Sequence, residues 1–124
     1  MDAVIFDCDG VLIDSETIAH EVELEAMQRL GLFFDSAADA ARFQGLAVKD
    51  WSVALDAVHR AQRGAPLPAG FIAGLSAEIT RRVLGDIRPI AGAVEAALAF
   101  RGLKAIASSS PKVELYGKVR GLGL

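Results

Sequence analysis

Two short apolar runs lie near opposite ends of the chain, and most of the sequence between them has helical periodicity. Residues 3–6 (AVIF) end in the turn Asp7-Cys8-Asp9-Gly10, and residues 103–107 (LKAIA) end in three serines. The first run, rich in β-forming residues and bounded by a turn signal, predicts a strand buried on both faces, and the second run predicts another strand. An ordinary crossover between parallel strands needs only one helix. The sequence therefore predicts an α/β fold, a βαβ core interrupted by a helical insertion.

The helical pattern places amphipathic segments between and after the two runs. Apolar residues recur at helical spacing, and glycine or proline closes most segments. In the segment after Lys49, the expected buried stripe is Trp51, Leu55 and Val58, and His20 and His59 are expected on helix surfaces. The predicted helices cover residues 17–30, 36–43, 49–63, 69–84, 91–100 and about 111–120.

Composition excludes several classes of protein. The chain has 124 residues, is 52% hydrophobic and carries a net charge of −3. No apolar run is long enough for a membrane helix, the apolar fraction argues against disorder, and the acidic balance argues against nucleic acid as a partner. Cys8 is the single cysteine, so no internal disulfide is possible, which fits a reducing cytoplasm. We expect Cys8 to be a small core side chain.

The first strand ends in residues that suit chemistry. Asp7 and Asp9 are two apart, so in extended chain their carboxylates would point to the same side. Their repulsion could be relieved by a hard cation such as Mg²⁺ or by a shared proton. One carboxylate could then act as nucleophile and the other as acid/base. The alternative is structural: a turn at Asp9-Gly10, with Asp14 or Ser15 as a helix N-cap.

The second strand ends in Ser108-Ser109-Ser110-Pro111. Backbone N–H groups at a helix N-terminus, with hydroxyls beside them, form a ready phosphate site. Simple N-capping is the alternative, and one serine would satisfy it. In an open parallel sheet, ligands bind beyond the carboxyl ends of the strands. The two clusters together therefore predict a phosphate-handling site.

The segment VIFDCDGVLIDSE (residues 4–16) resembles motif I of the haloacid dehalogenase-like (HAD) superfamily, in the form typical of its phosphatase and phosphomutase branch. Residues 106–110 resemble motif II, and residues 89–92 resemble the segment where such chains return from cap to core. The resemblance implies a Rossmann-like parallel-sheet core, incomplete here, over residues 1–14 and 86–124. A helical cap domain would cover residues 15–85.

The resemblance also implies roles for individual residues. Asp7 would be the nucleophile that forms an aspartyl-phosphate, and Asp9 the general acid/base. Asp7 and the backbone carbonyl of Asp9 would bind Mg²⁺, while Ser108 and Ser109 would hold the phosphoryl group. In the cap, the candidate substrate contacts are Gly45 and Lys49.

The implied reaction is hydrolysis of a small phosphorylated metabolite by a cytoplasmic enzyme, with sugar phosphates as the first candidates for the substrate. Dehalogenases of the superfamily lack the second aspartate, so Asp9 argues against that chemistry.

Two alternatives to a phosphatase remain. The β-phosphoglucomutase pattern has histidine where this chain has Ala19, with His20 one place further on, and arginine where it has Val48. Both differences favour phosphatase over phosphomutase. The later lysine and acidic pair of the superfamily do not follow Ser110, and Lys112 and Lys118 come too early to be that lysine. The sequence is therefore either part of a longer phosphatase or a catalytically inactive chain that serves as a binding or assembly partner.

Overall fold

The computed structural model describes residues 2–34, 43 and 46–124. Contacts divide the chain into two compact units: the first unit is Met1–Ala19 with Glu78–Leu124, and the second unit is His20–Ala77. The predicted helix over residues 36–43 lies outside the described residues except for Phe43. The elements follow in the order β1 (Ala3–Asp7), α1 (Ser15–Arg29), α3 (Val48–Arg63), α4 (Phe71–Gly85), α5 (Ala93–Ala99), β2 (Leu103–Ala107) and α6 (Lys112–Gly121).

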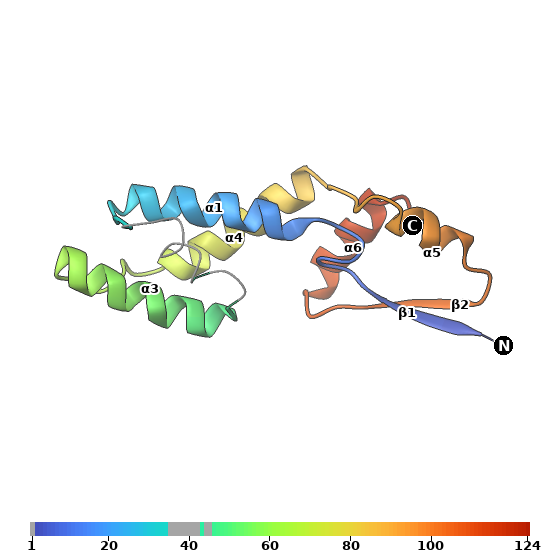
Figure 1. Cartoon of the computed structure of the whole chain (residues 1–124), viewed down its shortest axis with the longest axis horizontal. Helices are drawn as coiled ribbons and strands as arrows, with labels where there is room; N and C mark the ends of the chain where they lie inside the picture. The colour runs from blue at the N-terminus through green and yellow to red at the C-terminus, as the bar shows by residue number, and fades with distance from the viewer. Residues whose placement is uncertain (1, 35–42, 44–45) are drawn as a thin grey trace. The chain divides into compact units, whose positions relative to one another are not determined.

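The first unit contains a parallel pair of strands. β1 pairs with β2 in a register that runs from Ala3 opposite Leu103 to Asp7 opposite Ala107 (Figure 1). The predicted α/β arrangement, two parallel strands separated by a long helical segment, is confirmed. Because the strands are parallel and in register, the residues that follow them emerge at the same edge of the sheet. The division into core and cap at residues 14/15 and 85/86 stays a prediction.

The expectation that both faces of the first strand are buried is wrong for the described residues. Ile5 and Leu103 are 71% and 62% exposed, and burial alternates along β1. Phe6 and Ile106 are half-buried, and they line a pocket together with side chains of α6. An apolar run identifies a strand, but coverage of its second face depends on other elements. Among the described residues, one face of the sheet stays open.

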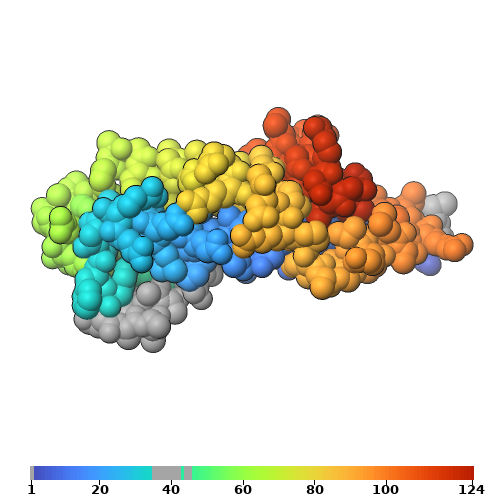
Figure 2. Space-filling view, turned by 90° about the horizontal axis from the view of Figure 1, so that it is seen from above, coloured from blue at the N-terminus to red at the C-terminus, as the bar shows by residue number. Residues whose placement is uncertain are grey.

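Two glycines allow α6 to pack closely against the end of α4 and the residues that follow it. A Cβ atom on Gly117 would lie 2.9 Å from the side chain of Leu84, and one on Gly121 would lie 2.6 Å from that of Ile87. These distances are too short for any larger residue without a shift, so glycine permits the close approach. The red residues of α6 accordingly lie directly against the golden residues that precede α5 (Figure 2). This packing orients the face of α6 that carries Lys118, whose exposure is only 3%.

The two connections between β1 and α1 and between α4 and α5 run side by side in the first unit. Ile13 forms an isolated bridge with Pro89, and the Asp14 N–H donates to the carbonyl of Arg88 at 2.7 Å. Asp14 also accepts hydrogen bonds from the N–H and hydroxyl of Thr17, at 3.3 and 3.0 Å. Asp14 is thus the N-cap of α1, as the structural alternative for this residue predicts.

The second unit is helical and is packed around aromatic side chains. The ring centroids of Phe34 and Phe43 are 5.6 Å apart and those of Phe43 and Trp51 are 6.4 Å apart, both edge to face. Trp51 and Leu55 are buried as predicted. No helix among the described residues is long and apolar enough to cross a membrane.

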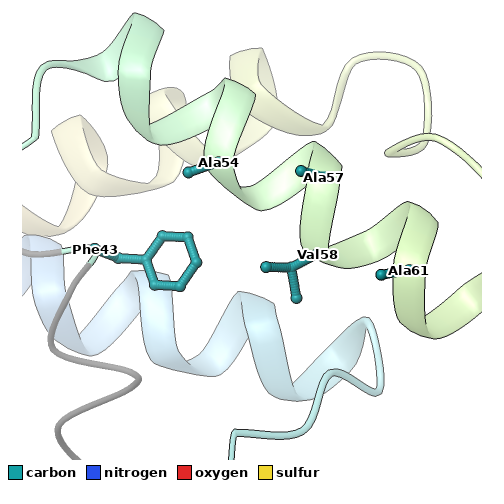
Figure 3. Close-up of a pocket in the computed structure, with 5 residues that line it drawn as sticks. All are labelled: Phe43, Ala54, Ala57, Val58 and Ala61. Atoms are coloured by element: carbon teal, nitrogen blue, oxygen red, sulfur yellow. The ribbon is translucent and has the colours of Figure 1, made fainter.

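Helix α3 departs from the expected stripe at one position. Val58 is half-buried beside an apolar pocket, where it faces Phe43, with Ala54, Ala57 and Ala61 also lining the pocket (Figure 3). His59 is buried instead, which corrects its expected surface position. Its Nδ1 lies 2.6 Å from the carbonyl oxygen of Ala65, and this hydrogen bond satisfies the ring nitrogen in the interior.

Candidate active site

The two predicted polar clusters meet at the carboxyl ends of β1 and β2. Asp7 is the last residue of β1, and Ser108 follows β2 directly. The hydroxyl of Ser110 donates to Oδ2 of Asp9 at 3.1 Å, across 101 positions of sequence. Folding therefore joins the aspartate and serine clusters into one hydrogen-bonded site.

Asp9 accepts side-chain hydrogen bonds from three residues of this site. Besides Ser110, it accepts a hydrogen bond from the hydroxyl of Ser15 at 2.9 Å. The ammonium of Lys118 lies 3.0 Å from Oδ1 and 3.2 Å from Oδ2 of the same carboxylate. Both carboxylate oxygens are thus occupied by donors from α1, the serine turn and α6. The Asp9 side chain is still 34% exposed, so its edge remains open to solvent.

Lys118 is a site residue that sequence reasoning missed. Its side chain is 4% exposed, and its Nζ also lies 3.0 Å from Glu114 and 3.0 Å from the hydroxyl of Ser110. One signal was present in the sequence: Lys118 lies at helical spacing from Leu115 and Leu122, on the apolar face of α6. A lysine on such a face needs a buried partner. Its main partner, Asp9, lies 109 residues away, which local patterns do not reveal.

The contacts between Asp9 and Lys118 determine their charge states. Burial alone would raise the pKa of Asp9, but hydrogen bonds from Lys118, Ser15 and Ser110 outweigh it and hold the pKa below its usual value. Burial alone would lower the pKa of Lys118, but hydrogen bonds to Asp9 and Glu114 outweigh it and raise the pKa. Asp9 is therefore a carboxylate and Lys118 an ammonium around neutral pH.

Asp7 differs from Asp9 in its surroundings. Its Oδ1 accepts the N–H of Cys8 at 2.7 Å, and the residue is exposed at the end of the strand. The chain turns after Asp7, because the N–H groups of Leu12 and Ile13 both donate to the carbonyl of Cys8. Besides a cation or a shared proton, the structure offers a third way to offset the expected repulsion between Asp7 and Asp9, because the ammonium of Lys118 contacts the carboxylate of Asp9.

Cys8 lies between the two aspartates and points into the interior. It is 0% exposed, and burial together with the charge of Asp9 raises the pKa of its thiol. The thiol is therefore protonated and shielded, which confirms the expectation of a small core side chain.

The serine turn presents hydroxyl and backbone groups at the start of α6. The Ser108 Oγ accepts the N–H of Ser110 at 3.0 Å and keeps its own proton for donation. Ser109 is exposed, and the N-cap of α6 makes no side-chain hydrogen bond to the helix. First-turn N–H groups of α6 are therefore not satisfied by a capping side chain, which suits an anion at this point.

The oxygen ligands at the strand ends agree in kind with Mg²⁺. This ion is usually bound by one or two carboxylates, with water and phosphate completing its shell. Asp7 offers a carboxylate, while the Asp9 carboxylate is engaged by Lys118 and leaves that residue its backbone carbonyl. In the described part of the chain, no three His, Cys, Asp or Glu side chains gather closely enough to hold a metal ion. The available oxygen ligands thus agree in kind with Mg²⁺ but do not by themselves complete its shell.

The two candidate cap residues, Gly45 and Lys49, stay predictions. Gly45 lies outside the described residues, and Lys49 is an exposed residue in the first turn of α3.

Comparison with known proteins defines the class to which this site belongs. The whole chain, residues 1–124, matches the model of the haloacid dehalogenase-like hydrolases. The chain therefore belongs to this family of hydrolases. A comparison with curated proteins finds no match.

Solved structures resemble the whole chain but are longer. A haloacid dehalogenase-like protein of unknown function from Agrobacterium tumefaciens is 30% identical with a TM-score of 0.77, over 100% of this chain and 54% of its own. A HAD family hydrolase from Deinococcus radiodurans, solved with bound phosphate and sodium, is 32% identical with a TM-score of 0.69, over 100% and 53%. A putative β-phosphoglucomutase from Thermotoga maritima is 25% identical with a TM-score of 0.71, over 100% and 57%. The chain spans about half the length of these structures.

Proposed function

We propose that the first unit carries the phosphoryl-transfer residues of a Mg²⁺-dependent phosphomonoester hydrolase. The observation that carries the proposal is the 3.1 Å hydrogen bond between Ser110 and Asp9, which unites the two strand-end clusters. Membership of the hydrolase family and the phosphate bound to the Deinococcus relative support it. The substrate would be a small phosphorylated metabolite of the sugar phosphate type, and the enzyme would work in the cytoplasm.

In the first step, Asp7 acts as the nucleophile. A carboxylate oxygen of Asp7 bonds to phosphorus while the bond from phosphorus to the ester oxygen breaks, giving an aspartyl-phosphate. Asp9 delivers a proton to the departing oxygen. This step requires Asp9 to be protonated when substrate is bound, although its contact with Lys118 favours the carboxylate.

In the second step, Asp9 acts as the base. Its carboxylate removes a proton from water, and the water oxygen bonds to phosphorus as the bond to Asp7 breaks. Inorganic phosphate leaves, Asp7 is again a carboxylate, and Asp9 is again protonated. The Ser108 hydroxyl and the Ser109 N–H would hold the phosphoryl oxygens throughout.

Mg²⁺ would be held by the Asp7 carboxylate and the Asp9 backbone carbonyl. When bound, it supplies the positive charge that lets an anionic nucleophile approach an anionic phosphate ester. We further propose that residues 15–85 act as the cap domain and that Gly45 and Lys49 contribute to substrate selection.

The test is hydrolysis of p-nitrophenyl phosphate by the purified chain, with Mg²⁺ and with EDTA. We expect turnover that needs Mg²⁺ and is lost in Asp7→Asn. Asp50→Asn, a change at an exposed aspartate in the first turn of α3, is the matched control and should retain turnover. Hydrolysis that persists in EDTA, or in Asp7→Asn, would contradict the assignment.

A phosphomutase is the second candidate, favoured by the similarity to the putative β-phosphoglucomutase from Thermotoga maritima. A mutase returns the phosphoryl group to a sugar, whereas a phosphatase passes it to water. Incubation with a hexose 1-phosphate separates the two, because release of inorganic phosphate favours hydrolysis and an isomeric hexose phosphate favours the mutase.

A further inference from the structure

A buried lysine that the proposed reaction does not use lies at the centre of the site. Lys118 is on α6, and its side chain is 4% exposed. Its ammonium contacts three groups: the Asp9 carboxylate at 3.0 Å, the Ser110 hydroxyl at 3.0 Å and the Glu114 carboxylate at 3.0 Å. A charge this deeply buried is expensive unless it is paired, and here two carboxylates share it.

The number of contacts limits what Lys118 can do. An ammonium has three N–H donors and no acceptor. Asp9, Ser110 and Glu114 supply one partner for each donor, so none is left for a substrate phosphate. Lys118 is therefore placed to orient protein groups rather than to bind the phosphoryl group.

The groups that Lys118 contacts come from both strand-end clusters. Asp9 follows β1, Ser110 follows β2, and Glu114 lies one turn before Lys118 on α6. Oδ1 of Asp9 is shared between Ser15 and Lys118, and Oδ2 between Ser110 and Lys118. Removing the ammonium leaves Asp9 with two hydroxyl donors only, and its carboxyl group can then rotate.

We propose that Lys118, held by Glu114, is a positioning residue that fixes the Asp9 carboxylate and the Ser110 hydroxyl in one arrangement. The consequence for catalysis rests on the proposed function, because Asp9 is there the acid/base. A positioned acid/base is effective only when its geometry is held within narrow limits. Loss of the ammonium should therefore slow the chemical step and leave substrate binding nearly unchanged.

The contact is tested first by a signal that does not depend on activity. The chain has only four lysines, at positions 49, 104, 112 and 118. In a ¹⁵N–¹H spectrum of lysine ammonium groups, a buried ammonium with three partners exchanges slowly with water and stays visible near neutral pH. We expect one such protected signal that vanishes in Lys118→Met, is weakened in Asp9→Asn, and persists in Lys112→Met, the exposed control on the same helix. A spectrum without a Lys118 signal, or one unchanged by Asp9→Asn, would overturn the proposal.

Kinetics then separate positioning from a merely structural role. We expect Lys118→Met to lower kcat by about 10-fold to 100-fold, the range usual for groups that orient catalytic ligands, with KM changed by less than about 2-fold. Lys118→Arg keeps the charge and should recover part of kcat. Glu114→Gln, which leaves the buried lysine in place, should give a smaller loss of kcat, and it serves as the second variant if Lys118→Met does not fold.

The outcomes for the two proposals are distinguishable. If the unaltered chain does not hydrolyse phosphate esters but shows the protected, Asp9-dependent signal, the proposed function fails and the positioning of Asp9 stands. If the chain is active and folded Lys118→Met or Glu114→Gln keeps full kcat, the positioning role fails and the proposed function stands.

Discussion

The first and second units use polar side chains in different ways. In the first unit, the contact between Lys118 and Asp9 spans 109 positions and brings strand ends, a turn and a helix together. In the second unit, Asp56 bonds to Arg60 within α3 and to the N–H of Leu67, only 11 positions away. Polar groups gathered from distant parts of a sequence are typical of sites, whereas local contacts stabilise helices and turns. This difference supports the proposal that the first unit carries the chemistry.

Removal of one carboxylate from each unit gives the largest expected contrast. Asp9→Asn should lower phosphate-ester turnover by about 100-fold or more, because amides do not act as acid/base groups. Asp56→Asn removes the most hydrogen-bonded aspartate of α3, and it should lower Tm while keeping turnover within about 2-fold of the unaltered chain. Turnover and Tm measured on both variants check this. Equal losses of turnover in the two variants would contradict the proposal that only the first unit carries the chemistry.

Core packing should dominate the stability of the second unit. Leu55 is 0% exposed on α3, so Leu55→Ala should reduce the free energy of unfolding by about 3 kcal/mol through lost burial and a cavity. Val53 is 65% exposed on the same helix, and Val53→Ala is the matched control with little expected change. Denaturant titration followed by circular dichroism measures both. Similar midpoints for the two variants would contradict the placement of Leu55 in the core.

The smallest effect concerns a surface ion cluster that belongs to the first unit. Hydrogen bonds from Arg81 and Arg82 lower the pKa of Glu78 to about 2, from an ordinary value of 4.5. A depressed carboxyl pKa stabilises the folded state above pH 4.5, and that stabilisation is lost as the pH falls towards 2. We expect Glu78→Gln to flatten the fall in Tm over this interval slightly. Identical Tm profiles from pH 5 to pH 2 for both proteins would contradict the assignment.

Much of the fold could be predicted from local patterns. The apolar runs located both strands, with β2 bounded at Leu103 and Ala107 as expected, and helical periodicity located the described helices to within a few residues. The motif around Asp7 and Asp9 indicated the family that the comparison then established. These features depend on neighbours in sequence, which is why they could be seen there.

The features that the sequence did not predict have a common physical cause. The open face of β1 and the burial of His59 depend on what lies across space from them. The importance of Lys118 depends on Asp9 at the opposite end of the chain. The order of residues in the sequence even spoke against a site role for Lys118, because Lys118 comes before the position expected for the catalytic lysine of the superfamily. Only the register of the strands and the docking of α6 could reveal its role.

The central claim is that Asp7 receives a phosphoryl group at the joined strand ends, and its most direct test is capture of that intermediate. The chain is mixed with a phosphate ester and Mg²⁺, quenched in acid, digested and examined by mass spectrometry. We expect one added phosphoryl group on the peptide that contains Asp7, and none in Asp7→Asn. Steady turnover with no acid-stable phosphorylation of that peptide at any quench time, or phosphorylation at another residue, would contradict it.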